Sequence, residues 1–143
     1  MRIAVDAMGG DHAPSVIVDG AVAAARHLDA EVVLVGPTAE IERALAAHDD
    51  WSTLGIAIVD APDVIGMSEA PAAALRRKPR ASVRVAADLV ASKEAAALVS
   101  VGHTGATVMA AHAAFGMIAG VGRGWRRRAR AWRRGSRYQR VSG

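Results

Sequence analysis

Short, almost uninterrupted runs of apolar residues recur along the first hundred residues of the chain. The four runs are 3–5, 32–35, 56–59 and 97–101, and each is rich in Val, Ile, Leu or Ala. Such runs, with no alternation of apolar and polar positions, are typical of strands that helices cover on both faces. The pattern therefore predicts four strands of a parallel sheet.

Between these runs, apolar residues recur at the spacing of an amphipathic helix, and Pro, Gly or Ser marks most of the boundaries. Helices are predicted over 14–28, 39–47, 71–77, 83–91 and 106–118, with Thr38 and Ser82 as N-caps of the second and fourth. Strands that alternate with helices indicate an α/β fold. We expect an open, doubly wound parallel sheet with helices on both faces.

The charge is distributed unevenly along the chain. The 143 residues include 18 Lys and Arg against 14 Asp and Glu, which gives a formal net charge of +4. All acidic residues lie within 1–122, which carries −5, whereas 123–143 contains nine Arg and no acidic residue. We therefore predict one domain over 1–122 and a basic, disordered tail over 123–143.

The tail allows three interpretations. Its Arg residues, interleaved with Trp125 and Trp132, suit nucleic-acid phosphates and bases or an anionic membrane surface. It also fits a solvated segment without function. The abundance of Arg, Gly, Trp, Ala and Ser, together with the loss of every acidic residue at one point, favours out-of-frame reading of GC-rich DNA.

Composition limits the chemistry and the location of the protein. The chain has no Cys, which excludes disulfides, thiolate nucleophiles and Cys-bound zinc or iron–sulfur sites. Asp6 and Asp11 interrupt the apolar N-terminus, so we predict no secretory signal and expect a cytoplasmic protein. The uncharged stretch 104–122 is long enough to span a membrane, but its Ala, Gly and His112 favour a buried helix instead.

Two segments follow strands at positions where parallel α/β sheets bind ligands. The first, 6–12, has the paired glycines Gly9 and Gly10, which let a ligand approach the backbone. The second, 102–107, leads from a strand through a Gly-rich turn into a helix N-terminus, whose free N–H groups favour an anion. These features predict phosphate binding. The alternative is that the glycines serve the geometry of the turns alone.

A basic cluster follows the irregular segment 61–70. It consists of Arg76, Arg77, Lys78 and Arg80. Several cations beside a cleft raise the local concentration of anions, so the cluster suits an acidic partner. The alternative is a solvated helix end, where cations are favoured by the helix dipole.

Three strings of sequence, in a fixed order, carry a resemblance to one family. They are MRIAVDAMGGDHAP over 1–14, VIGM over 64–67 followed by ALRRK over 74–78, and SVGHTGA over 100–106. Together they resemble the bacterial phosphate acyltransferases of fatty acid and phospholipid synthesis, the PlsX type. The resemblance covers about 1–123, so we expect the N-terminal part of such an enzyme.

This resemblance implies a fold, a reaction and partners. Family members have an α/β/α sandwich related to isopropylmalate dehydrogenase, are usually dimeric, and associate peripherally with the membrane. They move a fatty acyl group from acyl-carrier protein to inorganic phosphate, giving an acyl phosphate for phospholipid synthesis. No cofactor and no metal is expected. The competing hypothesis is a non-enzymatic module that binds phosphate, or nucleic acid through its tail.

The resemblance also suggests roles for individual residues. Substrate binding is predicted for Gly9, Gly10, Gly102, Thr104 and Gly105, catalysis for Asp11, His12 and His103, and carrier-protein binding for Arg76, Arg77, Lys78 and Arg80.

The sequence departs from the family pattern at two points. His103 stands where the family has Asn, and the pattern is lost after Arg123. The family's second half completes the sheet, the dimer surface and much of the acyl and carrier sites. We therefore expect this chain to be a truncated form that lacks full catalytic competence.

Overall fold

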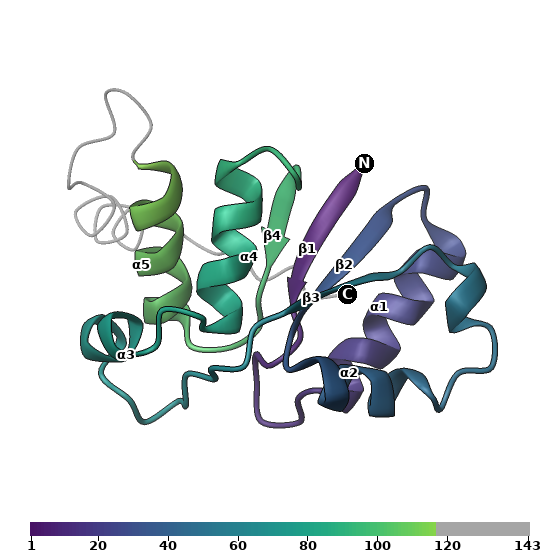
Figure 1. The fold of residues 1–143 in the computed structure, drawn as a ribbon, viewed down its shortest axis with the longest axis horizontal. Helices are drawn as coiled ribbons and strands as arrows, with labels where there is room; N and C mark the ends of the chain where they lie inside the picture. Colours follow the sequence, from purple (N-terminus) through teal and green to yellow (C-terminus); the bar gives the residue numbers. More distant parts are fainter. Residues whose placement is uncertain (117–143) are drawn as a thin grey trace, which may run out of the picture.

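A four-stranded parallel sheet forms the centre of the molecule. The computed structural model describes residues 1–116, and Figure 1 shows their arrangement. The strands are β1 (Arg2–Asp6), β2 (Glu31–Gly36), β3 (Ala57–Asp60) and β4 (Ala97–Val99), in the order β3-β2-β1-β4. Every pairing is parallel. The predicted α/β class and open parallel sheet are confirmed.

Helices cover both faces of this sheet (Figure 1). The helices are α1 (Ser15–His27), α2 (Thr38–Leu45), α3 (Pro71–Arg77), α4 (Ser82–Ala91) and α5 (Thr104–Phe115), with a short 3-10 turn, η1 (Trp51–Thr53). Helices α1 and α2 pack on one face, α4 packs on the other, and α5 lies against α4 and α3. β2 and β4 flank β1 on opposite sides, so the chain reverses its direction of winding at β1.

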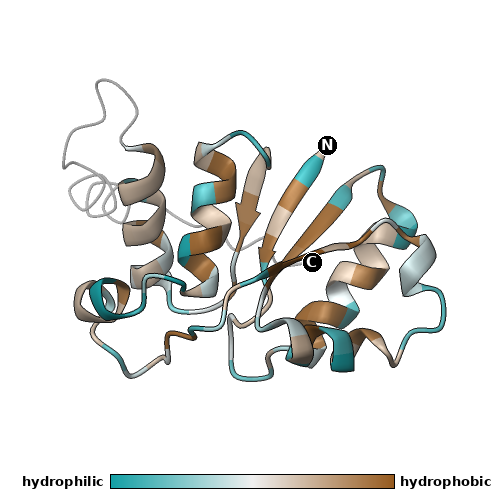
Figure 2. Ribbon diagram, in the orientation of Figure 1, coloured by the Kyte–Doolittle hydropathy of each residue, from teal (hydrophilic) through white to brown (hydrophobic). Residues whose placement is uncertain are grey.

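The two faces of the sheet bury separate apolar clusters. One joins Leu34 of β2 to Val18, Val22, Ile41 and Leu45 of α1 and α2, all fully or almost fully buried. The other joins Ala4, Val33 and Val35 to Ala86 of α4. Figure 2 shows strands that are largely brown, whereas the helices carry brown, pale and teal positions in turn. The strands are apolar at almost every position because helices cover both faces of the sheet.

Small residues allow α4 and α5 to pack closely. Ala87, Ala106 and Ala110 are buried between these two helices together with Val83. The uncharged helix after β4 was predicted to be buried, but only its Ala106 and Ala110 side is, whereas Val108, Met109 and Phe115 are exposed because no element of the described chain covers them. Among residues 1–116, no helix has the length and apolarity required to cross a bilayer.

Several predicted boundaries move by a few residues. Thr38 and Ser82 are the first residues of α2 and α4, and neither side chain caps its helix. The Thr38 hydroxyl instead donates to Asp60 Oδ1 over 3.0 Å, and Ser82 is buried. β4 ends at Val99, because Ser100 turns its side chain to Asp6 of the neighbouring strand. The predicted tail, 123–143, lies outside the described residues.

Candidate functional site

The carboxyl ends of β1 and β4 bring together the two Gly-containing segments that the sequence singled out. Strands β1 and β4 are neighbours in the sheet, with Val5 opposite Val99. A Cβ atom placed on Gly9 would lie 2.8 Å from the backbone nitrogen of Gly102, and one on Gly102 would lie 2.9 Å from Gly9 Cα. No side chain fits at either position without a backbone shift. The two glycines are therefore required by a crossing of two backbone segments.

A buried carboxylate holds this crossing in place. Asp6, only 5% exposed, accepts a hydrogen bond from Ser100 Oγ over 2.8 Å and from the Met8 backbone N–H over 3.2 Å. Ser100 Oγ in turn accepts the Gly102 N–H over 3.3 Å, and it lies 3.3 Å from the Thr107 hydroxyl. Asp6 thus caps its own turn and also links β1 to the turn after β4.

His103 is the N-cap of α5. Its Nδ1 accepts the Gly105 N–H over 3.2 Å, and its carbonyl oxygen accepts the Thr107 N–H over 3.0 Å. An imidazole nitrogen that accepts a hydrogen bond carries no proton, so the neutral ring has its proton on Nε2. The amides of Gly102 and Gly105, both predicted to bind phosphate, therefore already donate to nearby side chains. Thr104 and Ala106 supply the other two free amides of the first helical turn.

The space at this crossing is small. A cavity of about 10 Å³ is lined by Asp6, Gly9, Gly102, His103 and Thr107, with further residues from the loop 61–70 and α4. This volume is close to what one water molecule requires. Orthophosphate is larger than this cavity, so the ion does not fit here without movement of the lining residues.

The other predicted site residues lie around this cavity or outside it. Gly10 has a φ of +102°, a conformation that favours glycine. Asp11 and His12 lie in the turn before α1 with exposed side chains, and neither lines the cavity. Thr104 is exposed at the start of α5. Of the three predicted catalytic residues, the structure brings only His103 to the cavity.

The basic cluster is partly neutralised by acidic side chains. Lys78 pairs with Glu69 and donates to the Val64 carbonyl oxygen over 2.6 Å, and Arg77 lies 3.6 Å from the same carboxylate. The hydrogen bond from Lys78 lowers the pKa of Glu69 below its ordinary value, with help from the Gly66 N–H.

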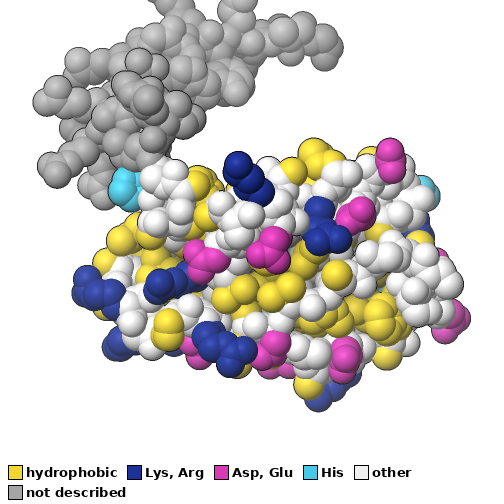
Figure 3. All heavy atoms as spheres, turned by 45° about the horizontal axis from the view of Figure 1, so that its top comes forward, with side chains coloured by type: hydrophobic (Ala, Val, Ile, Leu, Met, Phe, Trp, Pro, Cys, Tyr) yellow, Lys and Arg dark blue, Asp and Glu magenta, His cyan; other side chains and the backbone are white. Residues whose placement is uncertain are grey.

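Asp60 accepts hydrogen bonds at the end of β3. Its pKa is lowered mainly by the Thr38 N–H and hydroxyl, and further by Arg80, which lies 2.8 Å away. Arg76 and Arg77 have exposed side chains at the end of α3. On the face shown in Figure 3, Lys and Arg alternate with Asp and Glu instead of forming one basic area.

The sequence did not lead us to assign a site role to Asp6 or to Ser100. A usable signal was present, because Asp6 directly follows one apolar run and Ser100 interrupts the end of another, and the carboxyl ends of parallel strands lie at one edge of a sheet. What the sequence did not reveal was that β1 and β4 would be neighbours, because the paired residues Ile3 and Ala97 lie 94 positions apart in the chain.

Within 1–116, no three His, Asp or Glu side chains are grouped so that they could hold a metal ion. The groups that converge on the cavity are instead one carboxylate, two hydroxyls, an imidazole and backbone amides. These groups suit binding of a polar or anionic ligand by hydrogen bonds.

The fold is that of an α/β protein with a candidate ligand site at the carboxyl end of parallel strands, beside the point where the winding reverses. Comparison with known proteins makes the class specific. Residues 1–124 match the family model described as "Fatty acid synthesis protein", so the chain belongs to that family.

Curated relatives agree with this assignment. The chain is 48% identical over 122 residues to a phosphate acyltransferase of Acaryochloris marina, covering 85% of this chain and 35% of the relative. It is 49% identical over 123 residues to that of Herpetosiphon aurantiacus (86% and 33%) and 53% identical over 110 residues to that of Geobacter sulfurreducens (77% and 32%). The chain thus spans about a third of the length of these relatives.

Proposed function

We propose that this chain is the phosphate-binding part of an enzyme that transfers a fatty acyl group from acyl-carrier protein to inorganic phosphate. A phosphate oxygen attacks the thioester carbonyl carbon, the C–O bond forms, and the C–S bond breaks. The carrier leaves as a thiolate that takes up a proton, and the acyl phosphate is released for phospholipid synthesis. The relatives are named phosphate acyltransferases, which supports both the acyl transfer and the role of phosphate.

The observation that carries the proposal is the Gly9–Gly102 crossing directly before the N-terminus of α5. Such a crossing brings backbone N–H groups from two loops to one place, and the helix dipole adds a partial positive charge there. An anion held at this point faces the free Thr104 and Ala106 amides of the first turn of α5. An oxyanion that forms on the carbonyl during attack needs donors of the same kind beside the bound phosphate.

The chain's own residues have distinct parts in this proposal. Thr104 offers an exposed hydroxyl and a backbone N–H at the first turn of α5, and Ala106 offers a second amide. Rotation of the His103 ring away from Gly105 would free a third amide and enlarge the cavity. Asp6 acts as a positioning residue, because it fixes Ser100 and thereby the Gly102 N–H.

The acidic carrier protein is proposed to approach the end of α3. Arg76 and Arg77 are exposed there, with Arg77 3.6 Å from Glu69, whereas Lys78 and Arg80 pair more closely with Glu69 and Asp60. Surface charges of this kind guide an encounter more than they hold the complex, so salt should weaken the approach. We assign the guiding role to Arg76 and Arg77 and a structural role to Lys78 and Arg80.

Two measurements on this chain test the proposal. Line broadening of the orthophosphate ³¹P resonance reports binding, and it should be lost in Gly102→Ala but kept in Gly20→Ala, because a Cβ on Gly20 meets nothing within 4 Å. Phosphate-dependent release of free carrier from acyl-carrier protein, with acyl phosphate trapped by hydroxylamine, reports the reaction. Broadening that is equal in wild type and Gly102→Ala would remove the crossing as the phosphate site.

The second candidate function is nucleic-acid binding through the tail, and the nine Arg of 123–143 favour it. Salt-sensitive retention on DNA that disappears when 124–143 is deleted would support this alternative. Absence of phosphate binding together with such retention would replace the enzymatic proposal.

A further inference from the structure

One wall of the small cavity at the backbone crossing comes from a segment without regular structure. Ile65 lies in the irregular segment 61–70, whereas the other lining residues lie in β1, α4, α5 or the turns after β1 and β4. The segment runs from the end of β3 past the start of α4 to α3 (Figure 1). Ile65 is partly buried against the apolar cluster that contains Val83 and Ala106, which line the cavity as well. Ile65 therefore closes one side of the cavity.

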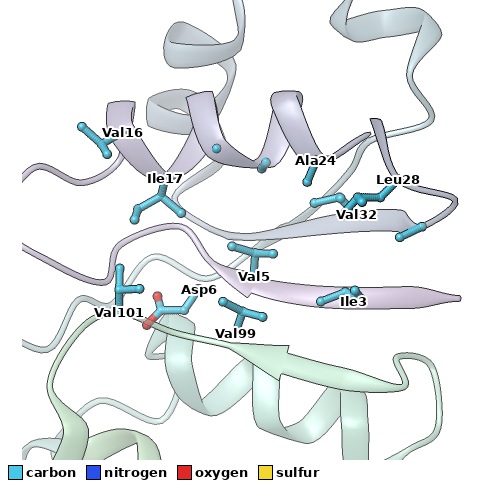
Figure 4. Close-up of a pocket in the computed structure, with 13 residues that line it drawn as sticks. Ile3, Val5, Asp6, Val16, Ile17, Ala24, Leu28, Val32, Val99 and Val101 are labelled. Atoms are coloured by element: carbon cyan, nitrogen blue, oxygen red, sulfur yellow. The ribbon is translucent and has the colours of Figure 1, made fainter. Parts of the chain in front are cut away.

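The opposite side of the cavity does not suit the entry of an anion. Asp6 lines both the cavity and an open apolar groove of about 330 Å³ between α1 and the sheet (Figure 4). Every other residue that lines this groove is apolar or Gly. A phosphate ion on this path would leave water for an apolar surface and pass a carboxylate. We therefore expect entry on the side that Ile65 closes.

Side chains hold this segment more than its backbone does. Within the described part of the chain, the only backbone–backbone hydrogen bond of 64–69 joins the Glu69 N–H to the Gly66 carbonyl oxygen over 3.1 Å. Glu69 Oε1 accepts the Gly66 N–H over 2.8 Å. Lys78 Nζ donates to the Val64 carbonyl oxygen over 2.6 Å and also to Glu69 Oε1. The Glu69–Lys78 ion pair thus connects most of the contacts that fix the segment.

The two ends of the segment are anchored independently of this ion pair. The Asp63 N–H donates to the Arg80 carbonyl oxygen over 3.3 Å, and the Asp63 carbonyl oxygen accepts the Ser82 N–H over 3.1 Å. At the other end, Pro71 begins α3, which packs against α5. A segment with few backbone hydrogen bonds between two fixed points opens at a lower cost than the helices beside it. Movement can therefore be confined to 64–70.

We propose that 64–70 is a strap that closes the phosphate cavity, and that the Glu69–Lys78 ion pair is a latch that sets how often the strap opens. Phosphate enters when the pair separates and Ile65 leaves the wall of the cavity. Glu69 and Lys78 are positioning residues, because they act on the strap and do not touch the ion. This inference rests on the proposed phosphate site and adds the residues that control access to it.

The proposal predicts that a weaker latch gives tighter phosphate binding. A ligand that binds only the open form has an apparent Kd equal to its intrinsic Kd divided by the open fraction. Lys78→Met removes the ion pair and the hydrogen bond to the Val64 carbonyl oxygen, so it should tighten phosphate binding about fivefold. The effect is limited because the side chains of Glu69 and Lys78 are 24% and 30% exposed.

Two further variants grade the effect. Glu69→Gln loses the charge but keeps an oxygen that can accept the Gly66 N–H, so it should tighten binding only about twofold. Ile65→Ala shortens the side chain that closes the cavity and leaves the ion pair in place. It should also tighten binding, which makes the prediction independent of Lys78.

The affinity is measured by titrating the ¹⁵N-labelled chain with inorganic phosphate and following the Thr104 and Ala106 amide resonances. Glu31→Gln is the matched control, because it breaks an ion pair with Arg2 at the amino ends of β1 and β2, and it should leave the affinity unchanged. Exchange of the Gly66 amide with water reports the latch without phosphate. It should be at least about threefold faster in Lys78→Met than in wild type.

The outcomes separate the strap from the phosphate site. Faster Gly66 exchange in Lys78→Met without tighter phosphate binding would overturn the strap and leave the site. Unchanged Gly66 exchange would show that the ion pair does not hold the segment. Weaker binding in Lys78→Met would make Lys78 a ligand of the ion, which also overturns the proposal. Absence of phosphate binding in wild type and in every variant would remove the phosphate site and the strap together.

Discussion

Substitution of Gly9 by Ala tests the backbone crossing on which the site depends. The new Cβ would lie 2.8 Å from the Gly102 nitrogen, 3.1 Å from Asp6 Oδ2 and 3.2 Å from Ser100 Oγ. The nearest atom belongs to the backbone, so no rotation of a side chain relieves the contact. The two loops have to move apart by several tenths of an ångström.

The expected cost combines two opposing effects. Overpacking of a tight site destabilises proteins by about 1–3 kcal/mol, whereas Gly→Ala lowers the entropy of the unfolded chain and stabilises by about 0.4–1 kcal/mol. The Asp6–Ser100 hydrogen bond and the β1–β4 pairing resist the movement, so the overpacking should dominate. We expect a net loss of about 1–2 kcal/mol in the free energy of unfolding.

Urea unfolding followed by circular dichroism measures this change, with Gly20→Ala as the matched control. Gly20 lies inside α1, and its added methyl group meets nothing within 4 Å, so this exchange should stabilise the protein by about 0.5–1 kcal/mol. The two Gly→Ala variants should therefore move in opposite directions. A Gly9→Ala protein as stable as wild type would show that the two loops do not approach this closely.

Two further predictions concern polar groups. Ser100→Ala removes the donor to Asp6 Oδ2 and the acceptor of the Gly102 N–H, so it should lower the free energy of unfolding by about 1–3 kcal/mol. The control is Ser68→Ala in the exposed loop. It should leave the free energy of unfolding unchanged within about 0.5 kcal/mol in the same urea titration. The pKa values of Glu69 and Asp60 are lowered in the folded protein from their ordinary values of 4.5 and 3.8. The two carboxylates therefore contribute fully to stability above these ordinary pKa values. This contribution is lost as the pH falls through the lower pKa values of the folded state. Stability measured against pH should fall below about pH 4.5, and Lys78→Met should make this fall less steep; an equally steep fall in Lys78→Met would contradict the assigned cause.

The strands and the class of fold could be predicted because their signal is local. An apolar run such as 32–35 is buried on both faces in any parallel sheet, and the structure places it in β2. The predicted helix and strand boundaries were less accurate where a side chain forms a hydrogen bond with a residue distant in the sequence. Thr is a residue type common at helix N-caps, but the Thr38 hydroxyl donates its hydrogen bond to Asp60 at the end of β3.

The candidate site was predictable in position but not in its hydrogen bonds. The rule for strand ends located Gly9 and Gly102, and the chain order alone did not show that β4 would pair with β1. The basic cluster was predicted to be an anion site from its charge alone. Its ion pairs with acidic side chains depend on how the loop 61–70 folds back, which places Glu69 beside Lys78.

His103 shows how one residue type supports two different roles until its contacts are known. The sequence suggested catalysis, whereas the structure uses Nδ1 to cap α5. Asn, the residue that the family pattern has here, is among the best N-caps, so His103→Asn should keep the stability within about 0.5 kcal/mol, and His103→Ala should lower it by about 0.5–2 kcal/mol. Both variants are measured by urea unfolding and by phosphate-dependent release of carrier. If the ring serves as a cap, Asn retains the stability and any release activity that the wild type has. Loss of release in a fully stable Asn variant would instead require the imidazole itself in the reaction.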